Sequence, residues 1–338
     1  MKKRITSADV AKEAGVSRAT VSYILNNTEG TRISDITRDR VLEAAKRLGY
    51  HLDINAQALK TNRSMSIGVV SRRDVTESRF VYVLGGIKDV LGKEKYSILL
   101  CSDEKDSIGY PEYLRLYHSK KIDGIIFISY QEQLEIEHAE ERASLMLKEQ
   151  IPCVFADYHL QNPMVNGVDI NYYHGAYITT KYLIDRGHKS IAFLIPELNT
   201  EQERQRLEGV KKAVSEADKV QLKLYSAGEK EESFSENVVK MLTDREQYTS
   251  IITAWGKMAL ITLYHTNRMR INVPQEISVI SLAGDNAANY TYPKLSASEL
   301  PLYELGVNCA QGLIDSLNKP EMPVNLKLPC KLSIRDSC

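Results

Sequence analysis

Two short amphipathic segments near the start of the chain, separated by only three residues, constrain its fold more than any other feature. The first covers residues 7–14 and the second residues 18–25. Gly15 can end the first helix in the left-handed conformation, and the Ser17 hydroxyl can cap the second. Two short helices joined by a glycine-containing turn predict a helix-turn-helix, whose second helix enters the major groove of DNA.

A third helix is predicted over residues 35–48, with Ser34 as its N-cap and Gly49 at its end. Apolar residues recur at helical spacing in all three segments, which predicts an all-α head over residues 1–52. The inner faces are expected to hold Val10, Ala11 and Ala14, then Val21, Ile24 and Leu25, and finally Ile36, Val41, Ala44, Ala45 and Leu48.

The charge of the chain is unevenly distributed, although its net charge is zero. Residues 1–63 hold twelve Lys and Arg against seven Asp and Glu, a surplus of +5, and the remainder therefore carries −5. A basic head on an acidic body is expected if only the head touches the phosphates of DNA.

Residues 9–26 (DVAKEAGVSRATVSYILN) and 33–50 (ISDITRDRVLEAAKRLGY) resemble the signature of the lactose-repressor/galactose-repressor (LacI/GalR) family. The resemblance continues through landmarks such as residues 151–157 and 273–280, so it covers essentially the whole chain. It implies a bacterial, sequence-specific transcriptional regulator that binds a palindromic operator as a homodimer.

The resemblance assigns base recognition to Arg18, Ala19 and Tyr23. An arginine can bond guanine through two parallel hydrogen bonds, and an alanine can contact the methyl group of thymine. Tyr23 departs from the arginine frequent at this place in the family, and it can donate one hydrogen bond. The other residues expected at the DNA from the head are Thr6, Ser17, Thr20, Ser22, Asn26 and Arg32.

Residues 53–64 are similar to the hinge of the family, a segment too short to be a stable helix alone. In the family, two hinges fold against each other on DNA and insert a leucine into the minor groove. Leu59 occupies that place, where an apolar wedge kinks the duplex. The alternative is an ordinary linker residue packed on the body. Leu52 replaces the usual proline, which leaves the entry angle of the hinge less fixed.

From residue 65 onward, apolar runs alternate with amphipathic stretches, which predicts parallel sheets with helices on both faces. The resemblance implies the two-lobed fold of periplasmic sugar-binding proteins, with Rossmann-like α/β lobes and a ligand cleft between them. The first lobe is expected at about 65–167 and 297–325, and the second at about 168–296 and 326–338. The predicted strands are Ser66–Val70, Ser97–Cys101, Gly124–Ile128, Cys153–Ala156, Ile191–Ile195, Ser250–Ala254 and Ser278–Leu282.

Several classes of protein are disfavoured by the sequence. No run approaches eighteen apolar residues, and the basic start of the chain is not followed by an apolar core, so we expect a cytoplasmic protein without a membrane segment. The five cysteines are widely spaced and indicate buried thiols rather than a metal site. His188 and His138 lack the partners of a catalytic or metal site, so neither an enzyme nor a cofactor is expected.

The predicted cleft keeps some polar residues of the family and lacks others. Asp157 and Arg206 match an aspartate and an effector-binding arginine. Trp255 replaces an asparagine that commonly touches the effector, and Ala283 replaces a carboxylate. Asp285 stands two positions later, where it can substitute for that carboxylate. Ser71 and Arg72 follow the first strand of the body, where the family often lines its pocket, and Arg72 favours an anionic ligand.

Three interpretations of the cleft stay open. Trp255 can stack on the ring of a cyclic effector such as a sugar or a sugar phosphate. It can instead fill the cleft, which would leave a regulator that needs no small molecule or that responds to a protein partner. As a third option, Asp285 turns into the cleft and replaces the missing carboxylate. A soluble sugar-binding protein with an accessory head is the remaining alternative, and the sequence identifies neither effector nor operator.

Overall fold

The computed structural model describes residues 5–25, 33–50, 63–71, 78–107, 109–129, 138–197, 200–228, 231–319 and 323–338. The chain divides into two compact units, Met1–Ser64 and Met65–Cys338. None of the helices in the described ranges is long and apolar enough to cross a membrane. Four residues that the sequence placed at functional sites lie outside these ranges, namely Asn26, Arg32, Leu59 and Arg72.

The first unit begins with α1 (Ser7–Ala14) and α2 (Arg18–Leu25), which match the predicted helix-turn-helix. Thr6 and the carboxylate three residues later cap α1 reciprocally. Gly15 ends the helix at φ 62°, and the amide of Thr20 donates to the Ser17 hydroxyl at 3.1 Å. Caps of this kind satisfy backbone groups that a short helix leaves unpaired. The local sequence therefore determines where α1 begins and ends and where α2 begins.

The third helix, α3 (Asp35–Leu48), closes a small core against the first two. The expectation for Ile36 is wrong, because this side chain is 80% exposed. It precedes Val41 by five residues, and a helix rotates such a position away from the apolar stripe. The buried core consists of Val10, Ala11, Ala14, Val21, Ile24, Val41, Ala44 and Ala45.

The second unit contains two six-stranded sheets, one for each lobe. All neighbouring strands run parallel except β10 and β12. The first sheet has the order β11 (Asn325–Pro329), β5 (Gly167–Asn171), β4 (Cys153–Ala156), β3 (Gly124–Ile128), β1 (Ser66–Val70) and β2 (Ser97–Cys101). The second has the order β12 (Lys331–Ser333), β10 (Ser296–Glu299), β9 (Ser278–Gly284), β8 (Ser250–Thr253), β6 (Ser190–Ile195) and β7 (Gln221–Ser226).

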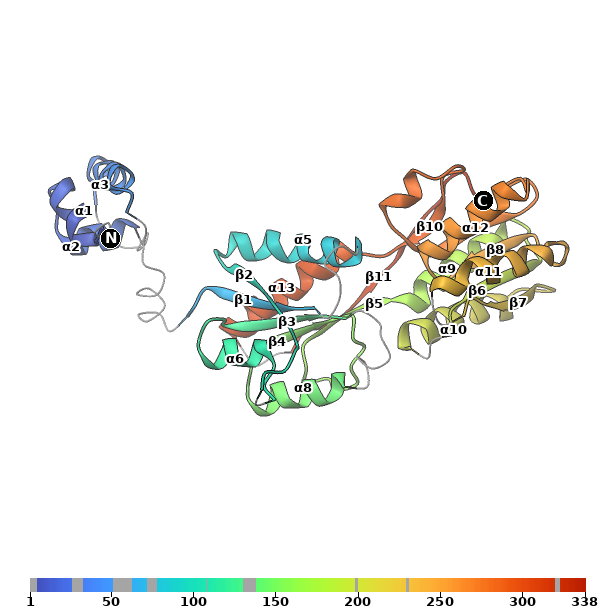
Figure 1. Cartoon of the computed structure of the whole chain (residues 1–338), viewed down its shortest axis with the longest axis horizontal. Coiled ribbons are helices and arrows are strands. Elements are labelled where there is room, and N and C mark those ends of the chain that lie inside the picture. The colour runs from blue at the N-terminus through green and yellow to red at the C-terminus, as the bar shows by residue number, and fades with distance from the viewer. Residues whose placement is uncertain are drawn as a thin grey trace. The chain divides into compact units, whose positions relative to one another are not determined.

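Helices cover both faces of the first sheet, as predicted (Figure 1). Ile126 and Ile128 of β3 pack in the same core as α5 (Ser78–Lys93) and α13 (Leu302–Asn318). The intervening Phe127 packs on the opposite face with α6 (Glu112–His118) and α8 (Ala139–Lys148). Because both faces are buried, the central strands need continuous apolar runs. The remaining helices have the bounds α9 (Tyr172–Asp185), α10 (Glu201–Ser215), α11 (Glu231–Thr243) and α12 (Gly256–Arg268).

The chain passes between the lobes at three points, after β5, between β10 and α13, and between β11 and β12. The first sheet therefore extends to Asn171 and to Pro329, a few residues past the expected crossings. Five strands (β5, β7, β10, β11 and β12) lie outside the predicted runs. They are short, polar or at a sheet edge, so they lack the continuous apolar pattern that marked the central strands.

Helix α10 approaches α9 so closely that only glycine fits at the contact. A Cβ atom on Gly209 would lie 2.3 Å from the carbonyl oxygen of Tyr173. This contact holds α10 beside the first turn of α9 and thereby positions the residues of α10 described below.

We expect Gly209→Ala to destabilise the protein by about 1–3 kcal/mol, because the methyl group must push two backbones apart. The matched control is Gly92→Ala near the end of α5, where a Cβ meets nothing within 4 Å. That change should be neutral or stabilise by up to about 1 kcal/mol. Urea unfolding measures both, and equal effects of the two variants would contradict the packing role of Gly209.

Candidate functional site

The exposed face of α2 carries the predicted base-reading residues. Arg18, Ala19 and Tyr23 are exposed, the last by 44%, and Ser22 is half-buried. On the opposite face of α2, Val21 packs in the core of the head. The helix is therefore anchored by its apolar side and presents polar groups on the other, as a recognition helix requires.

Three of the predicted DNA-contacting hydroxyls take part in caps. The Thr6 hydroxyl donates to Asp9 Oδ2 at 2.7 Å. The Ser17 and Thr20 hydroxyls lie 2.9 Å apart and are hydrogen-bonded to each other. These groups hold the ends of α1 and α2, and any contact with phosphate would be made from these positions. The contacts predicted for Asn26, Arg32 and Leu59 stay predictions.

The second candidate site lies where the lobes meet, at the end of β4. Asp157 is fully buried and has φ 64°, a left-handed conformation that aspartate tolerates better than most residues. Its Oδ1 accepts from the Ile170 amide at 2.9 Å, and its Oδ2 accepts from the Tyr172 hydroxyl at 2.6 Å. Arg79 of α5 forms an ion pair with Oδ2. Asp157 thus ties the ends of β4 and β5 to α5 and α9.

The charge of Asp157 is set by its partners. Burial alone would raise the pKa of this carboxyl, but the Arg79 charge and the contacts from His159 and Tyr172 outweigh it and hold the pKa well below its usual range. Asp157 is therefore ionised across the physiological range. The same burial raises the pKa of the Tyr172 hydroxyl, which stays protonated and can donate.

Arg206, the other matched residue, lies on α10 and is only 1% exposed. Its guanidinium stacks 4.3 Å from the centre of the Tyr172 ring and forms an ion pair with Glu203. The indole Nε1 of Trp255 donates to Glu203 Oε1 at 2.7 Å. The structure therefore connects Asp157, Arg206 and Trp255 through Tyr172 and Glu203.

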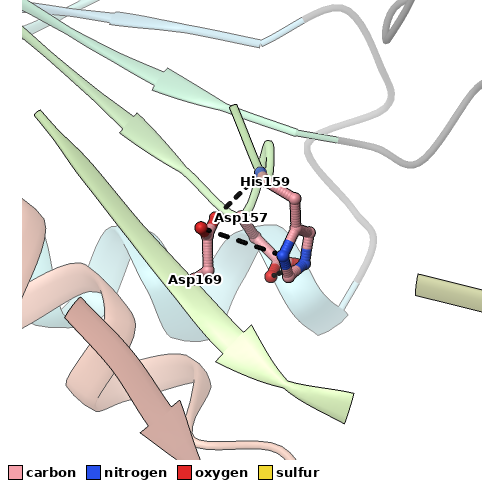
Figure 2. Close-up of side chains that lie close together, drawn as sticks. All are labelled: Asp157, His159 and Asp169. Atoms are coloured by element: carbon pink, nitrogen blue, oxygen red, sulfur yellow. Dashed lines mark hydrogen bonds and ion pairs between the residues drawn. The ribbon is translucent and has the colours of Figure 1, made fainter. Parts of the chain in front are cut away.

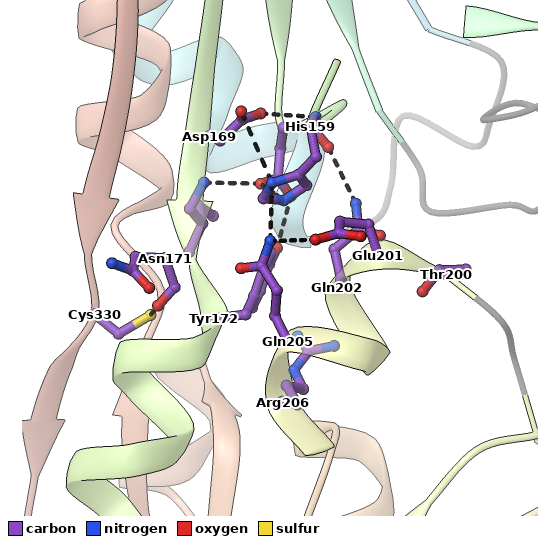
Figure 3. A network of polar contacts seen from close by, with 12 residues as sticks. His159, Asp169, Asn171, Tyr172, Thr200, Glu201, Gln202, Gln205, Arg206 and Cys330 are labelled. Carbon is purple, nitrogen blue, oxygen red and sulfur yellow. Dashed lines mark hydrogen bonds and ion pairs between the residues drawn. The ribbon is translucent and has the colours of Figure 1, made fainter. Parts of the chain in front are cut away.

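Helix α10 of the second lobe also bonds to the end of β4 in the first. Gln202 Nε2 donates to the backbone carbonyl of Asp157 at 3.1 Å. Gln205 Nε2 lies 3.4 Å from His159 Nδ1 and donates to Glu201 Oε1 at 2.9 Å. Figure 3 shows this network, in which the first turns of α10 face the ends of β4 and β5. Polar contacts of α10 thus join the two lobes.

The other residues predicted for the effector have different surroundings. Trp255 is half-buried, with its ring edge-on to Phe234 at 5.8 Å. Ala283 is half-buried near the end of β9. Asp285 is exposed, and its carboxylate accepts from the Ala287 amide at 2.9 Å, where it caps a short 3-10 helix. Ser71 is half-buried directly after β1.

Most partners of Asp157 and Arg206 were not evident from the sequence. Glu203 had a usable signal, because it precedes Arg206 by three residues and so shares its face of the helix. Arg79 and Tyr172 carried no such signal, since each meets Asp157 only after the first lobe has folded. The other missed residues of the network are His159, Asp169, Gln202 and Gln205.

We expect Arg79→Met to destabilise the protein by about 3–5 kcal/mol, because it leaves the buried carboxylate of Asp157 without its cation. The matched control is Arg115→Met, which removes an exposed arginine 3.8 Å from Glu112. This control should cost less than about 1 kcal/mol. Chemical denaturation at neutral pH measures both changes, and a cost for Arg79→Met no greater than that of the control would contradict a structural role for the buried pair.

Two family models match the chain. Residues 6–53 match the bacterial regulatory proteins of the lacI family, and residues 180–338 match a periplasmic binding protein-like domain. Full-length relatives include the HTH-type transcriptional regulator RegA of Clostridium saccharobutylicum, 31% identical over 93% of both chains. Catabolite control protein A of Priestia megaterium is 29% identical over 98% of this chain and 99% of its own. The repressor PurR of Mannheimia succiniciproducens is 28% identical over 98% of both.

Solved structures have the same fold. The Lac repressor dimer bound to operator and an anti-inducer aligns with a TM-score of 0.78 at 22% identity, over 99% of both chains. The complex of the transcriptional regulator CelR with cellobiose aligns with a TM-score of 0.66 at 22% identity, over 99% of this chain and 100% of its own. The head with its exposed second helix and the two-lobed body define a DNA-binding transcriptional regulator, not an enzyme. The chain belongs to the LacI family.

Proposed function

We propose that this regulator is a cytoplasmic homodimeric repressor, which binds a palindromic operator with one half-site for each head. The observation that carries the proposal is the exposed face of α2, with Arg18, Ala19 and Tyr23 outward and the apolar face packed in the head. Two-fold symmetry of a dimer would match that of a palindrome. Leu59 is proposed as the minor-groove wedge of each hinge.

Arg18→Ala should weaken binding to a selected operator by about 1–3 kcal/mol and relax preference at one base pair in each half-site, because a bidentate contact to guanine is lost. The matched control is Arg47→Ala on α3, which removes an exposed arginine paired with Glu13. Fluorescence anisotropy on the operator and on scrambled DNA of equal length measures both variants. Equal losses on the two DNAs would contradict base recognition, and selection that recovers no palindrome would contradict the repressor proposal.

We further propose that a small molecule bound where the lobes meet controls operator affinity. Gln202 Oε1, Glu203 Oε2 and Arg206 Nε are buried there and have no hydrogen-bond partner within the described part of the chain. Buried polar groups are usually satisfied by protein, water or ligand, so this cluster favours a polar effector such as a sugar or a sugar phosphate. The effector must compete with Glu203 for Arg206 and differ in affinity for two arrangements of the lobes.

A regulator that needs no small molecule, or that responds to a protein partner, is the second candidate. The observation in its favour is that both residues predicted to bind the effector already have partners within the protein. Arg206 is paired with Glu203, and Asp157 is paired with Arg79. An ion pair inside the protein can thus satisfy a buried charged side chain that would otherwise bind a carboxylate or hydroxyl of an effector.

Titration with sugars, sugar phosphates and nucleobases distinguishes these candidates, because Trp255 is the only tryptophan of the chain and bonds to Glu203. An effector that reaches Arg206 should change the fluorescence of Trp255. Arg206→Lys should then weaken that response about tenfold or more, because lysine cannot replace the planar guanidinium, while operator binding without effector persists. A full panel without response would favour the second candidate, and an unchanged response in Arg206→Lys would contradict the assigned site.

A further inference from the structure

The first lobe carries a cluster of potential metal ligands whose combined role the proposed function leaves open. Asp157, His159 and Asp169 each bring one ligand atom to within 4.8 Å of the other two. Asp157 and His159 are buried at the end of β4, and Asp169 is half-buried on the neighbouring β5. Figure 2 shows the imidazole beside the two carboxylates. The cluster therefore combines one nitrogen ligand with two carboxylates in a largely buried place.

The imidazole of His159 gives an independent indication of a ligand. Its side chain is 3% exposed, and its Nε2 atom is buried without a hydrogen-bond partner in the described part of the chain. Buried polar atoms are usually satisfied, and neutral imidazole is the commonest metal ligand in proteins. Nε2 lies 3.2 Å from Asp157 Oδ1. Two ligands of one zinc ion, each about 2.0–2.2 Å from the metal, lie roughly 3.0–3.5 Å apart, so this spacing suits a shared ion.

The contacts of Asp157 leave one of its oxygens able to bind an ion. Oδ2 holds both the ion pair with Arg79 and the hydrogen bond from the Tyr172 hydroxyl. Oδ1 accepts the Ile170 amide at 2.9 Å, and its other neighbour is the unsatisfied Nε2 of His159. A carboxylate oxygen has two lone pairs, so Oδ1 can accept this amide and still coordinate a metal. The cation of Arg79 and a metal ion would thus use different oxygens.

Asp169 is the carboxylate whose charge is less well balanced. Its Oδ1 accepts the backbone amide of His159 at 2.9 Å, and its Oδ2 lies 3.8 Å from His159 Nδ1. Burial raises the pKa of the Asp169 carboxyl, and the charge of Asp157 acts in the same direction, while His159 opposes them. A carboxylate removed from water is costly unless a cation pairs with it. A metal ion would supply to Asp169 the positive charge that Arg79 supplies to Asp157.

We propose that Asp157, His159 and Asp169 form a binding site for a divalent transition-metal ion in the first lobe. One imidazole nitrogen and two carboxylates favour Zn²⁺ or a similar ion over Mg²⁺ and Ca²⁺, which prefer oxygen ligands alone. The inference goes beyond the proposed function and requires no metabolite. His159 Nδ1 also lies 3.4 Å from Gln205 Nε2 of the second lobe, so a bound ion would adjoin a contact between the lobes.

Isothermal titration calorimetry with Zn²⁺ tests the site on the full-length protein, stripped with EDTA and free of DNA and metabolites. We expect one ion to bind at this site in each chain. Asp169→Asn should lower its affinity by about 100-fold or more, because a neutral amide replaces a charged ligand, and loss of even an outer partner of a metal costs about 10–100-fold. Asparagine has the same shape and still offers an oxygen to the His159 amide, so this variant should fold.

A second variant, His159→Gln, removes the nitrogen ligand and should lower the affinity to a similar extent. The matched control is His188→Gln. His188 belongs to the second lobe, where its Nδ1 lies 2.8 Å from the Thr249 hydroxyl, and its replacement should leave Zn²⁺ binding unchanged. Urea unfolding shows whether each variant is folded. Zn²⁺ should raise the unfolding midpoint of the wild type and of the control, because it binds the native state, but not that of Asp169→Asn or His159→Gln.

The absorption spectrum of the Co²⁺-loaded protein identifies the ligands and should indicate nitrogen and oxygen. Three results would overturn the proposal: a wild type that binds no Zn²⁺, an undiminished affinity in Asp169→Asn and His159→Gln, or a Co²⁺ spectrum of thiolate ligands, which would assign the ion to the cysteines. The first result would mean that the two carboxylates hold a protonated imidazole instead. None of these measurements uses DNA or an effector, so a silent metabolite panel bears only on the proposed function.

Discussion

The buried ion pair of Asp157 and Arg79 is the interaction on which the body of this regulator depends. The carboxylate holds the end of β4 to Ile170 of β5 and to Tyr172 of α9, and its backbone carbonyl accepts Gln202 from the second lobe. One residue thus links two strands and two helices through its side chain, and α10 through its backbone carbonyl. Because an unpaired charge in this position would be costly, the pair restricts how the ends of the strands can rearrange.

The parts of the fold that sequence predicted are those determined by neighbouring residues. The head was predicted through its caps and periodic stripes, and Ile36 failed because it lies off the stripe at the start of its helix. The central strands were predicted from continuous apolar runs, whereas edge strands such as β7, with its polar and half-exposed residues, were not. Position in a sheet is a tertiary property, and only strands buried on both faces show it clearly in their composition.

At the candidate sites, individual residues could likewise be predicted from the sequence, whereas their partners, which depend on tertiary structure, could not. Asp157 and Arg206 were identified individually, but the Arg79 that neutralises Asp157 lies 78 residues earlier in the chain. Glu203 lies only three residues from Arg206, and its role still depends on the burial of both. The junction of the lobes is thus a network of internal donors and acceptors in which Gln202 Oε1, Glu203 Oε2 and Arg206 Nε have no partner within the described part of the chain. Under the proposed function, an effector would act there by competing with Glu203 for Arg206.

The discontinuous course of the chain has a consequence for how the protein is made. The core of the first lobe includes Leu305, Cys309 and Leu313 of α13, which follow all of the second lobe except its last strand, β12. One edge of each sheet is supplied by β11 and β12, which come later still. On the ribosome, the first lobe must therefore wait with an uncovered apolar face until most of the second lobe and α13 have been synthesised. Translation order and folding order differ, and chaperones can act on the nascent chain during this interval.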